Sequence, residues 1–160
     1  MVKKHKIGLF VNTGTASSPT WKRIKKSTEL TIAMNTETEE YDYIADENPT
    51  TVVQQYKPAI EQALTMYEDE DDFNYFWDLF YDTVTGKDAE TEVMLVFMFD
   101  GDNTEGYKAW KCGCTINFEN LNAVDSSLNF NINFAGTIEK GTATVTGTAP
   151  DLTPTFTPSV

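Results

Sequence analysis

The sequence has few of the residues on which most enzyme and metal sites depend. It contains one histidine, His5, and two cysteines, Cys112 and Cys114, among its 160 residues. A single histidine in a basic N-terminal stretch excludes most Ser–His, Cys–His and histidine–metal arrangements. The Cys-Gly-Cys spacing fits neither a CxxC redox pair nor a set of zinc ligands, so we expect two free, buried thiols. Because a phosphate-binding loop and a dinucleotide fingerprint are also missing, we expect no catalysis, cofactor or metal.

Positive charge and long apolar runs are scarce as well. Twelve Lys and Arg residues oppose 25 Asp and Glu residues, which gives a formal net charge of −13. This balance excludes tight binding of nucleic acid, although a negatively charged surface would let DNA pass without binding it. Carboxylate pairs arise by chance in so acidic a chain and do not indicate a glycosidase. No run is long enough for a membrane span or, after the opening KKHK, for a signal peptide, so we expect a protein made in the cytoplasm.

The few positive charges gather at the start of the chain. Seven of the 12 basic residues lie within residues 1–26, whereas most acids lie between Glu37 and Glu105. The distribution has two interpretations, which the sequence leaves open. It serves solubility alone, or the basic end of one subunit meets an acidic surface of another.

Ten Phe, seven Tyr and three Trp residues argue for a folded domain, and the clearest element is a helix over about residues 70–85. Its bulky residues recur with the spacing of an amphipathic helix, at Phe73, Phe76, Trp77, Phe80, Tyr81 and Val84. Asp69, Asp71 and Asp72 precede this stripe and can accept hydrogen bonds from the free N–H groups of the first turn. We expect the stripe, Trp77 included, to pack into the core while Asp78 and Asp82 face outward.

Most of the remaining chain alternates apolar and polar residues with the period of a β-strand. Residues 92–100 differ, because they are apolar on both faces and should be buried on both, inside the domain or at a subunit contact. The other predicted strands cover residues 7–11, 21–26, 30–35, 51–56, 60–67, 107–119, 128–134 and 138–146.

Two segments should lie outside the compact part of the fold. Residues 36–49 are rich in acids and end at a proline, so we expect a long exposed arm with some strand character. Residues 147–160 are rich in Thr and Pro, with Pro150, Pro154 and Pro158. We expect them to be a loose tail, or extended across a neighbour. The predicted organisation is therefore a β-domain of residues 1–146 followed by a flexible tail of residues 147–160.

A calcium site is the one metal site that the sequence suggests. Residues 100–105 begin like an EF-hand loop, but Glu105 stands where that loop requires glycine, so a hairpin turn is the better prediction. One function that the sequence permits is that of a monomeric acidic β-sandwich that binds carbohydrate or calcium, and it is kept as the alternative to the self-assembling role considered below. Sizing chromatography with and without calcium would separate it from a self-assembling subunit.

Four long stretches together resemble the major tail proteins, or tail tube subunits, of long-tailed bacteriophages. They are IGLFVNTG, WKRIKKSTELTIAMNTETEEYDYIADENPTT, QYKPAIEQALTMYEDEDDFNYFWDLFYD and YKAWKCGCTINFENLNAVDSSLNFNINFAGTIEKGTATVT. They cover nearly all of residues 7–146, and the resemblance rests on their order and character, not on one short motif.

This resemblance implies an antiparallel β-sandwich or barrel with one flanking helix. Six copies would form a ring, and rings would stack into a hollow tube through which DNA passes during ejection. The implied partners are other copies of the chain, the tape measure protein and DNA in the lumen, and other tail proteins at the tube ends. The implied location is the virion tail, assembled in the host cytoplasm.

The resemblance also suggests which residues meet other subunits or the lumen. A basic segment and the acidic arm are candidates for contacts between rings, and an uncharged or acidic wall would offer DNA no phosphate contacts. Asparagine is a poor strand former, so three of them on one face of a strand suggest such a wall, with chance exposure as the alternative. The candidate contacts between rings are Lys22, Arg23, Lys25, Lys26, Glu39, Glu40, Tyr41 and Asp42. The candidate lumen residues are Thr115, Asn117, Glu119, Asn129, Asn131 and Asn133.

Overall fold

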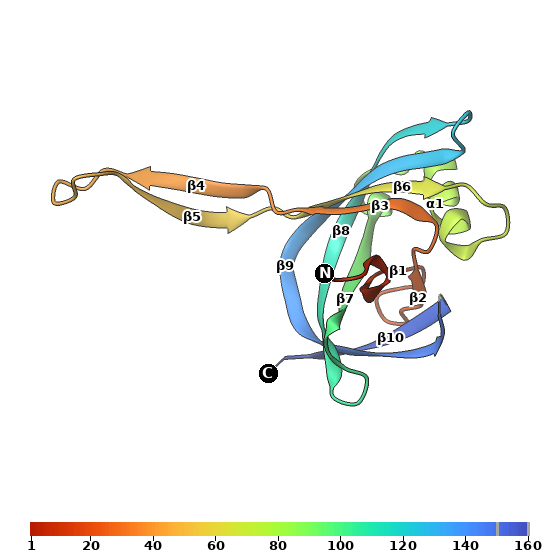
Figure 1. Cartoon of the computed structure of the whole chain (residues 1–160). Coiled ribbons are helices and arrows are strands. Elements are labelled where there is room, and N and C mark those ends of the chain that lie inside the picture. The colour runs from red at the N-terminus through yellow and green to blue at the C-terminus, as the bar shows by residue number, and fades with distance from the viewer. Residues whose placement is uncertain (150, 160) are drawn as a thin grey trace.

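The computed structural model describes residues 1–149 and 151–159, and within them the fold is mainly β with one α-helix. The antiparallel β fold with one flanking helix is therefore confirmed (Figure 1). The strands are β1 (Ile7–Asn12), β2 (Trp21–Arg23), β3 (Ser27–Ala33), β4 (Thr36–Tyr41), β5 (Thr50–Tyr56), β6 (Ala59–Thr65), β7 (Glu90–Asp102), β8 (Gly106–Asn122), β9 (Ser127–Thr148) and β10 (Asp151–Pro158). The helices are α1 (Asp71–Tyr81) and the short 3-10 turns η1 (Lys4–Lys6) and η2 (Gly86–Ala89).

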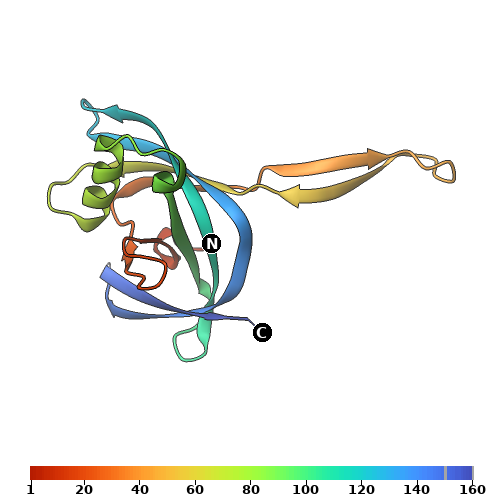
Figure 2. The ribbon, with the colours of Figure 1, turned by 180° about the vertical axis from the view of Figure 1, so that it is seen from behind.

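One strongly bent antiparallel sheet forms the body of the molecule. Its strand order is β2-β1-β7-β8-β9-β6-β3, and β10 also pairs with β9. The 22-residue β9 runs through two parts of the sheet, because its first part pairs with β6 and its last part pairs with β10. The bend lies at an irregularity where Gly113 pairs with Ala135 but Lys111 pairs with Glu139, and Gly136 there has φ +79°. Glycine adopts this backbone without strain, so the sheet curls over itself (Figure 2).

The curled sheet encloses apolar side chains on both faces of β7. Val93 and Leu95 belong to a larger core beneath α1, whereas Met94 and Val96 belong to a smaller core with Phe10. All four β7 side chains are at most 1% exposed. The prediction of burial on both faces is thus confirmed for residues 93–96, inside one domain, whereas Phe99 near the end of the predicted run is 51% exposed.

Helix α1 covers one side of the larger core, but the face that it buries differs from the predicted one. Phe76 is fully buried and stacks on Phe130 of β9, with ring centroids 4.4 Å apart. Trp77 is 36% exposed and Tyr81 is 73% exposed, so their predicted burial is wrong. On a helical wheel these two side chains lie about 100° and 140° from Phe76, beyond the buried face. That face also includes the fully buried Asp72.

The outward positions of Asp78 and Asp82 are confirmed, since both side chains are exposed. The helix ends at Tyr81, four residues earlier than predicted. Thr83 has φ +47°, a left-handed conformation that cannot continue an α-helix.

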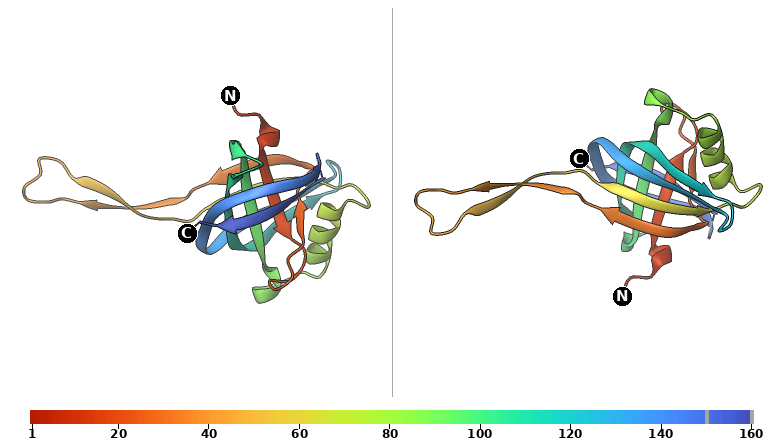
Figure 3. Two further views of the ribbon diagram at one scale, coloured as in Figure 1. Left: turned by 90° about the horizontal axis from the view of Figure 1, so that it is seen from below. Right: turned by 90° about the horizontal axis from the view of Figure 1, so that it is seen from above.

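The arm is a β-hairpin made of β4 and β5, which form a separate two-stranded sheet. It projects far from the body in every view (Figures 1 and 3). All seven residues of β5 are exposed. The arm is longer than expected, because residues 50–56 pair with β4 and form its second half.

The C-terminal segment also differs from its prediction. Instead of a loose tail, residues 151–158 form β10 and pair with residues 141–148 of β9. Pro154 is buried and Phe156 packs on the smaller core, so the apolar residues among the threonines attach the strand. Proline is tolerated there because β10 pairs with only one strand and leaves its other edge free of the ladder. Pro150 and Val160 of the predicted tail lie outside the described residues.

Candidate assembly surfaces

The structure brings the two groups of predicted lumen residues together on one face of the sheet. Thr115 pairs with Asn133, and Asn117 pairs with Asn131, across β8 and β9. The side chains between them point the other way, since Ile116, Phe130 and Ile132 are buried in the larger core. The polar face therefore lies on the side of the sheet opposite to α1.

Hydrogen bonds tie the side chains of this polar face to one another. Asn131 Nδ2 donates to Glu119 Oε1 at 2.7 Å, and Asn129 Nδ2 donates to Asn120 Oδ1 at 2.7 Å. Glu61 of β6 extends the face, because it pairs with Asn131. The face is neutral to acidic, with amides held by their neighbours.

The predicted basic segment is already engaged within its own subunit. Lys25 Nζ lies 2.7 Å from Asp151 Oδ1 and 2.9 Å from Glu70 Oε2. Lys22 Nζ lies 3.4 Å from Asp71 Oδ2. Lys26 is exposed, and its Nζ lies 5.2 Å from the centroid of the Tyr67 ring. These contacts join β2 and the residues after it to the start of α1 and to β10, so two of the segment's four charges serve the fold.

Asp72 explains why the basic segment and the helix meet. Its Oδ2 accepts hydrogen bonds from the backbone N–H of Lys25 at 3.0 Å and of Lys26 at 3.4 Å, and its Oδ1 accepts one from Phe73 N–H at 2.9 Å. A buried carboxylate is tolerated when backbone donors satisfy it in this way. Sequence reasoning identified Asp72 as a helix-start residue, but its link to a segment 47 residues away required the structure.

The attachment of β10 through Asp151 should depend on pH. The hydrogen bond from Lys25 lowers the pKa of the Asp151 carboxyl below its usual value of 3.8. A lowered pKa in the folded state means that this stabilisation is present above the usual value and is lost as the pH falls through the lowered one. We expect the hydrogen-exchange protection of β10 amides, corrected for intrinsic rates, to fall in this acidic range. Asp151→Asn should remove that pH dependence, and an unchanged profile would contradict the attachment.

The predicted arm residues occupy β4 and the residue after it. Glu39, Glu40 and Asp42 are exposed, and Tyr41 is half-buried against Tyr43, with stacked ring centroids 5.6 Å apart. Tyr41 Oη donates to Glu39 Oε2 at 2.9 Å. The arm points away from the basic segment of its own subunit, so the two candidate groups do not meet within one chain (Figure 3).

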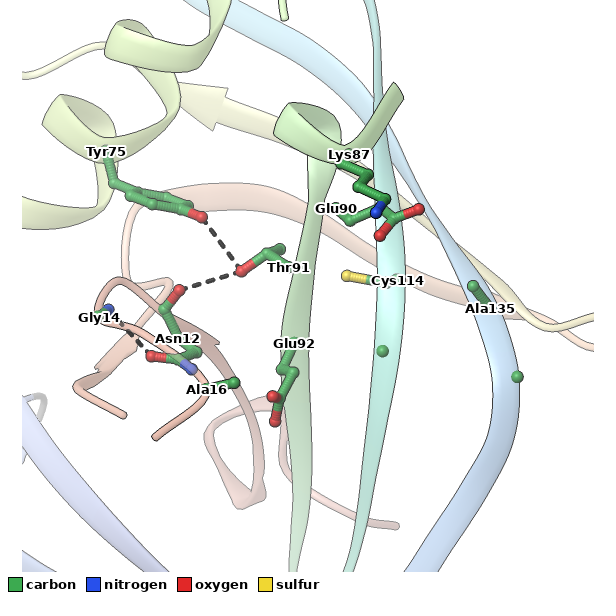
Figure 4. Close-up of a pocket in the computed structure, with 12 residues that line it drawn as sticks. Asn12, Gly14, Ala16, Tyr75, Lys87, Glu90, Thr91, Glu92, Cys114 and Ala135 are labelled. Carbon is green, nitrogen blue, oxygen red and sulfur yellow. Dashed lines mark hydrogen bonds between the residues drawn. The ribbon is translucent and has the colours of Figure 1, made fainter. Parts of the chain in front are cut away.

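A hollow of about 610 Å³ opens where β1 ends beside α1 and β7. Tyr75 Oη donates to Thr91 Oγ1 at 3.1 Å, which donates to the carbonyl oxygen of Asn12 at 3.0 Å (Figure 4). Cys114 lines the floor, and burial raises the pKa of its thiol to about 12. Burial also raises the pKa of the Cys112 thiol, so both cysteines stay protonated at neutral pH and are weak nucleophiles. Both are free and buried, as predicted.

In the turn at residues 100–105, which resembled a calcium loop, the Asp102 carboxylate is already bound by backbone N–H groups of the same turn. Asp102 Oδ1 accepts hydrogen bonds from the N–H groups of Thr104 and Glu105, at 2.8 and 2.7 Å. Asn103 bonds twice to the backbone of Val145. Among residues 1–149 and 151–159, no group of three or more His, Cys, Asp or Glu residues is arranged to hold a metal ion. No helix in this part of the chain is long and apolar enough to cross a membrane.

Comparison with known proteins finds similarity in structure alone. No protein-family model matches the chain, and no curated protein sequence matches it. A chain from the tail of an empty gene transfer agent particle, refined with helical C6 symmetry, superimposes with a TM-score of 0.57 at 13% identity. That match covers 86% of this chain and 97% of the other. A chain from the virion of a native gene transfer agent particle gives a TM-score of 0.58 at 11% identity, covering 88% and 98%. The resemblance is thus confirmed at the level of the fold: the chain has a tail tube-like β fold.

Proposed function

We propose that this chain is a structural subunit of a virion tail. Six copies form a ring, and the rings stack into a hollow tube through which DNA passes during ejection. The observation that carries the proposal is the fold match along 86% of the chain to a chain of a tail assembly with helical C6 symmetry. The protruding arm adds support, because an exposed hairpin with unpaired edges is suited to contacts between copies.

The polar face of β8 and β9 is our candidate for the lumen wall. Its side chains are neutral or acidic, and the amides of Asn129 and Asn131 already donate to Asn120 and Glu119, so the face offers DNA phosphates no cation. The tape measure protein would occupy this lumen before DNA does, and other tail proteins would cover the tube ends. Assembly of the tail would take place in the host cytoplasm.

The arm and the basic end of the subunit are our candidates for contacts between rings. The exposed acids Glu39, Glu40 and Asp42 would face cations of a neighbouring ring, among them Lys26. Because such exposed pairs are screened by salt, tube formation should weaken as ionic strength rises.

Negative-stain imaging of the purified chain tests the proposal directly. We expect hollow tubes or six-fold rings, at a subunit concentration raised stepwise and monitored by sizing chromatography. A monomer that never assembles, and whose elution changes when calcium is added, would contradict the proposal. That result would favour the alternative, a monomeric acidic binding module.

Positive charge on the polar face tests the position of the lumen. In the Asn117→Lys/Asn131→Lys double variant, each ring would present 12 new cations to the lumen. We expect tubes of this variant to retain DNA in a filter-binding assay, with retention that falls steeply as salt rises. A matched pair of lysines at Ala123 and Val124, on the exposed β8–β9 turn, is the control. Equal DNA retention by both variants would contradict a lumen on this face.

A further inference from the structure

A second hollow, of about 400 Å³, opens beside the N-terminal end of β1. Its apolar lining comes from Ile24, Met98 and Leu152, and its basic lining includes His5, Lys6 and Arg23. We call these six residues the basic socket. Its volume falls within the range of about 300–1,000 Å³ that is usual for ligand-binding pockets. In a chain of net charge −13, an apolar hollow surrounded by cations is suited to an occupant that is both apolar and acidic.

Arg23 is the cation of the socket that stands to gain most from such an occupant. Its Nη2 donates to the carbonyl oxygen of His5 at 3.1 Å, and it forms no ion pair with the carboxylates of the described residues. Burial lowers the pKa of its guanidinium. A partly dehydrated guanidinium next to an apolar surface binds a carboxylate more strongly than an exposed lysine does.

The end of the arm has the complementary chemistry. Ile44 is completely exposed, and Tyr43 is 53% exposed although its ring stacks on Tyr41, so the tip presents unburied apolar surface. Asp42, Asp46 and Glu47 surround them and are exposed as well. A tight turn presents Ile44 outward, because Asp46 N–H donates to the carbonyl oxygen of Tyr43 at 3.0 Å.

We propose that the arm tip of one subunit inserts into the basic socket of a second copy. Ile44 would enter the apolar lining, and the surrounding carboxylates would meet Lys6 and Arg23. The tip cannot reach the socket of its own subunit, because the arm extends away from the body (Figures 1 and 3). The contact joins two different surfaces and therefore propagates from copy to copy. It rests on the proposed function, since it names the contact that would join stacked rings.

Disulfide cross-linking tests the contact without depending on tubes. We would mix Ile44→Cys protein with Leu152→Cys protein under mild oxidation. The native Cys112 and Cys114 are 3% and 2% exposed and should not compete. We expect a cross-linked dimer in the mixture and not in either protein alone, since a disulfide requires Cα atoms within about 7 Å. Val124→Cys, on another exposed turn, is the matched control and should not cross-link with Leu152→Cys.

A charge exchange gives an independent measurement. Lys6→Glu and Asp46→Lys alone should each lower the yield of the Ile44–Leu152 cross-link, by about threefold to tenfold. Placed on opposite partners, the two changes should restore it. Ile44→Ser should lower tube yield at a fixed subunit concentration by about tenfold, because it removes the apolar side chain that the contact would bury. Val124→Ser should not lower the yield.

The outcomes separate this inference from the proposed function. Tubes without the cross-link would overturn the socket contact and leave the proposed function in place. A cross-link between subunits that form no rings or tubes would support the contact and count against the proposed function. Cross-linking of Leu152→Cys to Trp77→Cys, and not to Ile44→Cys, would overturn the proposal in favour of the aromatic side of α1 as the occupant.

Discussion

Replacing Phe76 with alanine should lower the free energy of unfolding by about 3–5 kcal/mol. Phe76 is fully buried, and its ring lies against Phe130 and Tyr75, at centroid distances of 4.4 and 5.2 Å. Because α1 covers one side of the larger core, the neighbouring strands cannot close the space that the ring leaves. Chemical denaturation, with the dependence on denaturant concentration checked for two-state behaviour, measures this loss.

The adjacent Trp77 supplies a matched control on the same helix. Its ring is 36% exposed and contacts mainly aromatic neighbours on α1 itself, including Phe73 and Tyr81. Trp77→Ala should therefore cost at most about 1.5 kcal/mol, although tryptophan is the larger side chain. A larger loss for Trp77 than for Phe76 would mean that the helix is rotated about its axis from the position described.

Removal of the arm should abolish the stacking of rings into tubes while leaving the body folded. Residues 36–56 can be replaced by a two-residue Asn-Gly turn, because the residues on either side of the arm already lie next to each other. Lys57 N–H donates to the carbonyl oxygen of Met34 at 3.0 Å, and Asn35 Nδ2 donates to that of Lys57 at 3.0 Å. Neither described core contains a residue of the arm. We therefore expect a melting temperature within a few degrees of that of the full chain, and no stacked tubes.

Calorimetry and negative-stain imaging of the same preparation separate the two expectations. The full-length chain, purified in parallel, is the reference for both. Normal tubes from the armless chain would show that the arm is not needed between rings. A strong drop in melting temperature would show that the arm is part of the cooperative fold, in disagreement with its exposed surface.

The sequence by itself determined those features that depend on consecutive residues. The spacing from Phe73 to Tyr81 specifies a helix because side chains three and four positions apart share a face. The continuous apolar run around Val93–Val96 specifies a strand buried on both faces. The alternation of Asn129, Asn131 and Asn133 with buried residues specifies a polar strand face. In each case the direction of a side chain follows from the local backbone period alone.

Only the tertiary structure decided which surface each element meets. Lys25 binds Asp151, 126 residues away, and the backbone of Lys25 binds Asp72, 47 residues away. Asp72 thereby takes a place on the buried face of α1, and Trp77 lies outside that face. The same long-range pairing converts an apparent Pro/Thr-rich tail into β10. The physical reason is that helix rotation and strand pairing depend on partners that the fold brings together, and no local periodicity records them.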